Sequence, residues 1–199
     1  MLGKTHMVVG ITTSLAVMQP ESVTEVVIGT AAAAIGGVIS DIDVSTSVSH
    51  KEADKISLLT VISIVAVAVF NYVFRLDIYQ RLLDNSSIAR IGIGMLAFIG
   101  ICVVGKEQPH RSFMHSILAL ILLSGALWVV FPVVVPYFAF AFLTHLVTDL
   151  FNFKDVRILY PIKKGICLHM FHAKGIANTV LCAIATIAAV VEIIYFSVC

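Results

Sequence analysis

Seven histidines and a few aspartates are the residues of this chain whose types and spacing could do chemistry. His145 and Asp149, in the segment THLVTD, lie four residues apart, so on a helix they share one face, one turn apart. Asp41 and Asp43, in SDID, follow an apolar segment. Two carboxylates this close repel each other unless a cation or a proton lies between them. Alone, the first pattern equally fits an ordinary i,i+4 hydrogen bond and the second is weak evidence. Together, and with all seven histidines at one end of the predicted bundle, they favour a metal site.

A third element, HRSFMHS, begins at His110 and stands ahead of a long apolar run. His110 and His115 are five residues apart, which is about 140° around a helix. They fit one site only if His110 lies in an irregular or capped turn before the helix, and Pro109 and Ser112 favour such a start. Arg111 lies between them. It is either a charge that sets membrane orientation or a guanidinium placed to bind a phosphate in bidentate fashion.

The candidate metal ligands combine imidazole and carboxylate groups, which suit zinc, manganese or iron(II) better than magnesium or calcium. They exceed what one ion needs, which allows a two-metal site that holds the attacking and leaving oxygens of a phosphoester. Zinc is favoured, and Asp149 is the preferred bridging carboxylate. Asp43, Arg111 and Asp149 are expected to act in catalysis, any carboxylate that is not a ligand serving as general base. The predicted ligands are His6, Asp41, Asp43, His110, His115, His145 and Asp149.

The composition indicates that membrane helices position these residues. The 199 residues are 59% hydrophobic and 13% charged, whereas soluble domains are about half apolar and about a quarter charged. The length suits one domain, taken as residues 1–199. A net charge of +1 provides no basic surface for nucleic acid. The four cysteines form no CxxC pair, so neither a disulfide framework nor a cysteine zinc site is expected.

The fold predicted is an all-α, polytopic transmembrane bundle of about six to seven helices, because a spanning helix needs about 20 mostly apolar residues. The first segment lacks a good cleavage site and is expected to be a retained helix rather than a signal peptide. FPVVVP at 131–136 divides the longest apolar run into a tight helical hairpin. The predicted helices are 5–19, 24–40, 56–74, 90–105, 113–131, 133–149 and 176–198.

Basic residues are distributed unequally between the two ends of this bundle. Ten Lys and Arg fall at the N-terminus and in the loops 41–55, 106–112 and 150–175, and three, at 75, 81 and 90, fall on the opposite side. The positive-inside tendency places the first set in the cytoplasm. All seven histidines fall at that same end, which scattered core histidines would not do. His50, His169 and His172 are taken individually as polar interface residues.

Four elements, in this order, resemble the LexA-regulated, membrane-bound metal-dependent hydrolases, the YdjM-like family. They are KTH at His6, SDID at 40–43, HRSFMHS at 110–116 and HLVTDLFN…ILYP at 145–161. The resemblance implies a metal-dependent hydrolase, and a distant similarity to zinc-dependent phospholipase C and related nucleases implies phosphoester hydrolysis. Ser112, Met114 and Ser40 depart from the usual glycine, threonine and proline. These departures concern loop geometry rather than the candidate ligands.

The function predicted is a metal-dependent hydrolase of the inner membrane whose active site faces the cytoplasm. Its expected partner is a membrane lipid or lipid-linked substrate cleaved at a phosphoester. The alternatives are a proton or metal-ion transporter and a non-catalytic protein with a structural metal. Transporters place ionisable groups near the bilayer midplane, and the apolar spans here lack them except for Glu192 near the end of the last one.

Overall fold

The computed structural model describes residues 2–43, 65–66, 69–75, 88–170, 172 and 175–198. This part of the chain is helical and holds no β-strand, as predicted. Three short 3-10 segments join the helices: η1 (Ile39–Asp43), η2 (Phe113–His115) and η3 (Pro132–Val134). A further helical stretch covers 69–74. The six complete helices are α1 (Gly3–Met18), α2 (Val23–Gly36), α5 (Ile88–Lys106), α6 (Ile117–Val130), α7 (Val135–Leu150) and α8 (Ile176–Val198).

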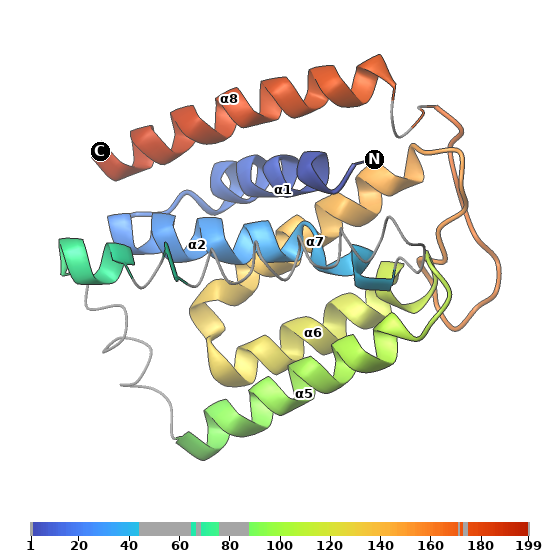
Figure 1. The fold of residues 1–199 in the computed structure, drawn as a ribbon, viewed down its shortest axis with the longest axis horizontal. Helices are drawn as coiled ribbons and strands as arrows, with labels where there is room; N and C mark the ends of the chain where they lie inside the picture. The colour runs from blue at the N-terminus through green and yellow to red at the C-terminus, as the bar shows by residue number, and fades with distance from the viewer. Residues whose placement is uncertain are drawn as a thin grey trace.

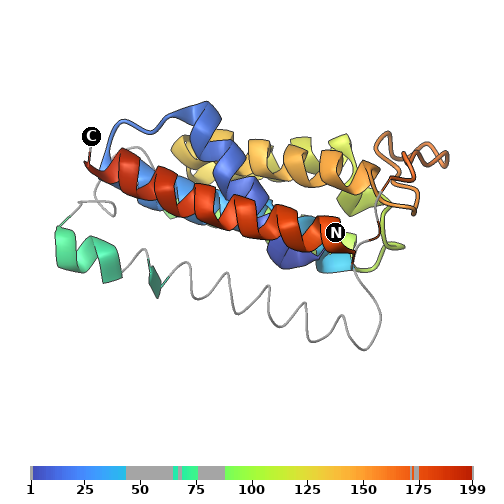
Figure 2. The same ribbon diagram turned by 90° about the horizontal axis from the view of Figure 1, so that it is seen from above.

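Helix α1 is enclosed by the rest of the bundle. It packs against α2, α7 and α8, while α2 also packs against α7. Helices α5 and α6 form a second pair, joined to the others through α7 (Figure 1). Viewed from above, α8 runs across the outside of α1 (Figure 2). The buried core between these helices is apolar and includes Leu15, Ala33, Leu123, Phe138 and Phe142.

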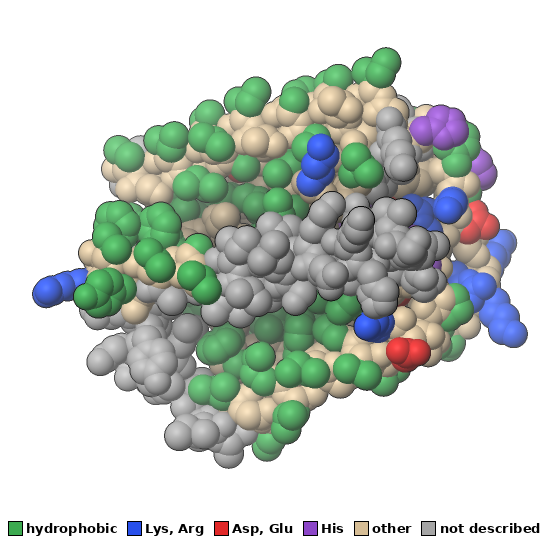
Figure 3. Space-filling view, in the orientation of Figure 1, with side chains coloured by type: hydrophobic (Ala, Val, Ile, Leu, Met, Phe, Trp, Pro, Cys, Tyr) green, Lys and Arg blue, Asp and Glu red, His purple; other side chains and the backbone are tan. Residues whose placement is uncertain are grey.

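Within the residues that the structure describes, three helical segments are long and apolar enough to cross a membrane: Val23–Asp43, Pro132–Leu150 and Ile176–Val198. Helix α6 is apolar but shorter. The outer faces of α5 and α8 expose many large apolar side chains, which appear in the space-filling view (Figure 3). A soluble monomer rarely exposes apolar patches of that extent, whereas a lipid-facing surface requires them.

Two predicted helices have other bounds in the structure: one starts later and the other ends earlier. The expected helix 113–131 starts only at Ile117, because the Ser116 hydroxyl accepts the N–H of Ala119 as a helix cap. Residues 113–115 form η2 instead. The expected helix 24–40 ends at Gly36, and the chain continues through Gly37 into η1. Asp41 and Asp43 therefore lie on a tight turn rather than on α2.

The predicted proline turn is confirmed, since η3 separates α6 from α7. Most of the predicted helix 56–74 and most of the loops 41–55 and 75–89 lie outside the described residues. The same is true of His50 and of the basic residues at 51, 55, 81 and 174. The seven-helix alternation on which the orientation depends therefore stays a prediction.

Two adjacent glycines let three helices meet closely at one end of the bundle. A Cβ atom on Gly36 would collide with the carbonyl of Phe138 on α7. A Cβ atom on Gly37 would lie 2.8 Å from the carbonyl oxygen of His6 on α1. The absence of a Cβ atom at both positions thus permits close helix packing. The start of α1 lies beside the end of α7, where His6 Nδ1 is 2.9 Å from Thr148 Oγ1.

Candidate metal centre

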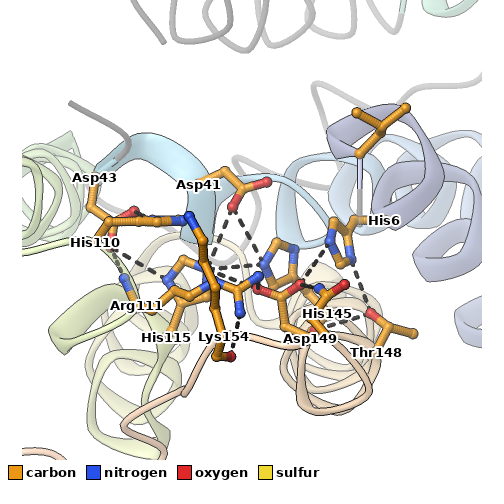
Figure 4. A network of polar contacts seen from close by, with 12 residues as sticks. His6, Asp41, Asp43, His110, Arg111, His115, His145, Thr148, Asp149 and Lys154 are labelled. Carbon is orange, nitrogen blue, oxygen red and sulfur yellow. Dashed lines mark hydrogen bonds and ion pairs between the residues drawn. The ribbon is translucent and has the colours of Figure 1, made fainter. Parts of the chain in front are cut away.

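The seven predicted ligands converge at the end of the bundle where α1 begins and α2 and α7 end (Figure 4). Three groups of side chains within the described residues offer ligand atoms that all lie within 4.8 Å of one another. Asp41, His115 and His145 each belong to two of the groups, so the groups form one continuous cluster. The groups are His6–Asp41–His145, Asp41–His110–His115 and His115–His145–Asp149.

The Thr148 hydroxyl contacts the His6 ring nitrogen that points away from the cluster. His6 Nδ1 lies 2.9 Å from Thr148 Oγ1, and the Thr148 hydroxyl already donates its hydrogen to the carbonyls of Thr144 and His145. With its hydrogen on these carbonyls, Thr148 accepts the Nδ1–H tautomer of His6, and in that tautomer His6 Nε2 is unprotonated in the neutral ring. That atom faces Asp149 Oδ1 at 3.2 Å. Two acceptors at this distance require a cation or a proton between them.

His145 is arranged in the same way. Its Nδ1 donates to the carbonyl of Gly37 at 2.8 Å, so its Nε2 carries the lone pair. Nε2 lies 3.3 Å from His115 Nε2 and 3.7 Å from Asp41 Oδ1. The rings of His6 and His145 are stacked with centroids 3.9 Å apart. Metal-binding histidines almost always donate the other ring N–H to an oxygen in this manner.

His115 lies in the middle of the cluster and is fully buried. Its Nε2 is 3.4 Å from Asp41 Oδ1 and 3.5 Å from Asp149 Oδ2, and its Nδ1 is 3.4 Å from Asp43 Oδ2. Burial by itself lowers the pKa of this imidazole, but the surrounding carboxylates, that of Asp149 first, outweigh it. The pKa of His115 is consequently raised well above its usual range. In the absence of metal a proton takes the place of the cation.

Asp43 lies behind the cluster rather than inside it. It accepts a hydrogen bond from His110 Nδ1 at 2.7 Å and another from the backbone N–H of Arg111 at 3.1 Å. The backbone of Arg111 is in the left-handed region, with φ 63°, a conformation that costs of order 1 kcal/mol in a residue with a Cβ atom. Asp43 thus holds the HRSFMHS turn in place. Among the described residues it belongs to none of the three groups.

Asp149 is the most heavily contacted carboxylate of the centre. Arg111 Nη2 lies 3.0 Å from its Oδ2, and Asn152 Nδ2 donates to its Oδ1 at 2.7 Å. The second terminal nitrogen of the Arg111 guanidinium, Nη1, donates to the carbonyl of Lys154. Both carboxylate oxygens are therefore oriented by the protein, and they point toward His6 and His115.

The residues present fit a divalent metal ion. Imidazole lone pairs and carboxylate oxygens meet in a buried space, and this is the donor set of zinc, manganese and iron(II) sites. The cluster is open on one side, where the side chains of Arg111, Asp41 and His110 are 11%, 13% and 33% exposed.

Three groups that orient the ligands were not predicted from the sequence: Thr148, the Gly37 carbonyl and Asn152. Thr148 lies three residues after His145, and Asn152 lies three after Asp149, so helical spacing from the two predicted ligands could have indicated both. The Gly37 carbonyl left no signal in the sequence, because a backbone oxygen is available at any residue.

The remaining described histidines stay outside the cluster. His169 and His172 lie in the loop after α7, where both contact the ring of Phe153. Cys167 lies near His169 and donates its thiol hydrogen to Asp155, which raises the pKa of the thiol. The expectation that these histidines are polar interface residues stays a prediction.

Comparison with known proteins gives one result. A family model described as YdjM inner membrane protein matches residues 1–198. No curated protein and no solved structure matches the chain.

Proposed function

The chain belongs to the YdjM inner membrane protein family, and from this premise we propose that it is a metal-dependent hydrolase of a phosphoester in or near a lipid headgroup. One observation carries the proposal. Histidine Nε2 atoms and carboxylate oxygens converge on one buried space, while oxygens behind the rings hold Nδ1 of His6 and His145. Such a set of acceptors, left facing one another, is suited to a metal cation.

A divalent ion bound there would polarise the phosphoester and lower the pKa of a bound water toward neutrality. Zinc is the favoured ion, and manganese and iron(II) accept the same donors. Asp41 belongs to two of the three groups, so its carboxylate is placed to bridge two ions. Asp149 belongs to one group.

The chain's own residues would bind the anion and move the proton. Arg111 brings a permanent positive charge to the open side of the cluster, where a guanidinium can bind two oxygens of a phosphate. His110 is the most exposed imidazole of the cluster, and Asp43 orients it through Nδ1. This pair suits proton transfer to a leaving group, since the imidazole that would act as the acid and the carboxylate that orients it are both in place.

The position of the cluster along the helices favours a headgroup substrate over transport. Asp41 and Asp43 are at the end of the segment Val23–Asp43, and Asp149 is one residue from the end of Pro132–Leu150. A site at the ends of spans lies at headgroup depth, whereas transport sites lie near the midplane. By the charge count given above, we propose that this end faces the cytoplasm.

The experiment that tests the function compares metal content and lipid turnover in purified wild-type protein, Asp149→Ala and Arg111→Ala. We expect wild type to hold a divalent ion and to hydrolyse a phosphoester-containing lipid. Asp149→Ala should lose both. Arg111→Ala should keep more metal than Asp149→Ala and show a raised KM for the anionic substrate.

Gly100→Ala is the matched control, because a Cβ atom there meets nothing within 4 Å. It should behave as wild type. If metal-loaded wild-type protein hydrolyses no phosphoester-containing lipid, the proposed hydrolase function is wrong and a structural metal site takes its place. An ion that crosses the membrane in vesicles would instead favour transport.

A further inference from the structure

Residues 153–170, here called the 153–170 hairpin, form a built element next to the metal centre. Val156 and Ile166 exchange two backbone hydrogen bonds of 3.0 Å, and the side chain of Val156 is fully buried. The returning segment is fixed to the end of α7, because Leu168 N–H donates to the Leu150 carbonyl at 2.7 Å and Met170 N–H donates to the Phe151 carbonyl at 3.0 Å. The side chains that point outward are therefore placed by an ordered backbone.

The 153–170 hairpin is joined directly to the residues of the centre. The backbone N–H of Arg157 donates to the Arg111 carbonyl at 3.0 Å. The Arg111 side chain bridges Asp149 and the carbonyl of Lys154. In addition, the Ile158 carbonyl accepts the N–H of Ile117, where α6 begins. Any surface that the hairpin contacts is consequently held at a fixed distance from the metal centre.

The outward surface of the hairpin is apolar and basic at once. Four Lys or Arg residues stand in 153–170 against one acid, Asp155, which already accepts the thiol hydrogen of Cys167. Figure 3 shows Lys and Arg side chains gathered at this end of the molecule. Between the basic residues, six large apolar side chains are 44–59% exposed: Phe153, Leu159, Ile162, Ile166, Leu168 and Met170.

We propose that the 153–170 hairpin lies in the headgroup layer of the membrane that holds the protein, with its apolar side chains inserted and its basic side chains on anionic lipid phosphates. Apolar residues interspersed with Lys and Arg are typical of elements that lie in the membrane interface. The charge selects a membrane surface over an apolar protein partner, since anionic headgroups complement Lys163 and Lys164, which are exposed.

The two helices that flank the 153–170 hairpin support its placement in the headgroup layer. The chain enters the hairpin from the segment Pro132–Leu150 and leaves it into Ile176–Val198, both of which can cross the membrane. Both ends are therefore held at the bilayer surface, and insertion is an intramolecular event at high effective concentration. The hairpin would set the depth of Arg111 and so bring lipid phosphates, rather than soluble ones, to the centre. That last step rests on the proposed function, whereas the membrane contact does not.

The test measures the depth of one side chain. Trp128 is the chain's only tryptophan, so Trp128→Phe gives a background in which Ile162→Trp reports alone. The protein is placed in phosphatidylcholine vesicles with and without phosphatidylglycerol, with bromine in the upper acyl chain. Quenching by bromolipid is compared with quenching by aqueous acrylamide. Leu159→Trp is a second reporter, and Glu107→Trp, exposed at the same end but outside the hairpin, is the matched control.

We expect bromolipid to quench the tryptophans at 162 and 159 more strongly than the one at 107, and acrylamide to show the opposite order. Phosphatidylglycerol should increase the bromolipid quenching at 162, and Lys163→Glu with Lys164→Glu should remove that increase. Equal quenching at 162 and 107, or strong acrylamide quenching at both 162 and 159, would overturn the proposal. Neither metal nor turnover enters this measurement, so it fails or succeeds separately from the hydrolase.

Discussion

Thr148→Val should weaken metal binding without removing any ligand. In the structure, Thr148 accepts the Nδ1–H of His6 at 2.9 Å, which leaves Nε2 free to face the centre. Valine has nearly the same shape and is also β-branched, so helix α7 should be unaffected. It cannot accept a hydrogen bond. The His6 ring must then either keep a buried, unpaired N–H or move its proton to Nε2.

The magnitude follows from these two outcomes. Leaving a buried donor unpaired costs about 1–3 kcal/mol. Loss of an outer-shell partner of a metal-bound histidine costs about 10–100-fold in metal affinity, which is about 1.4–2.7 kcal/mol. In the metal-free protein the proton can move to Nε2 and donate to Asp149 Oδ1, 3.2 Å away. The change should therefore appear in metal affinity much more than in the thermal stability of the metal-free protein.

The assay is a competition titration of zinc between a chelating indicator and purified protein in detergent. Thr148→Ser, which keeps the hydroxyl, is the control and should stay within a few-fold of wild type. We expect Thr148→Val to fall about 10–100-fold below both. Equal zinc affinities for Thr148→Val and wild type would refute the reasoning, because they would show that His6 Nε2 does not depend on its hydroxyl partner.

Three further predictions follow from the same centre. Gly37→Ala should lower both zinc affinity and Tm, since its Cβ atom would lie 2.8 Å from the His6 carbonyl oxygen, whereas Gly100→Ala should change neither. Equal Tm values for Gly37→Ala and wild type would contradict this. Asn152→Ala should cost about tenfold in zinc affinity, because Asp149 loses its orienting amide, and the indicator titration measures it. The pKa of His115 is raised, so a proton competes with the metal ion for this imidazole. Zinc affinity should therefore rise with pH and fall on acidification, by on the order of tenfold per pH unit for each proton displaced. A zinc affinity independent of pH would remove His115 from the ligands.

The sequence allowed most of the described helices to be predicted for physical reasons. It also singled out the side chains that meet in the three groups, whose role as metal ligands stays a prediction. The apolar runs are long enough to be recognised as spans, and α8 has the predicted bounds 176–198. The convergence of the cluster followed from alternation, since His6, Asp41 and Asp149 all lie at helix ends on one side. The alternation itself was inferred with segments that lie outside the described residues.

Local geometry was less accessible to sequence reasoning. Asp43 and Asp41 look equivalent in SDID, but the tight turn of η1 directs Asp43 behind His110 while Asp41 joins two ligand groups. The start of α6 depended on which serine caps it, and Ser112 and Ser116 were both available. The Gly37 carbonyl became an orienting group only because α2 ends one residue earlier. Such details are decided by packing, which spacing does not encode.

The most direct test of the central claim is the metal content of the purified protein, measured by elemental analysis after exposure to zinc and gel filtration. The comparison is wild type against His145→Ala, with Gly100→Ala as the control that leaves packing unchanged. Our account predicts one or two zinc ions in wild type and in Gly100→Ala, and a clear loss in His145→Ala. Wild-type protein without bound zinc, manganese or iron, or His145→Ala with the wild-type content, would contradict a metal centre at this end of the bundle.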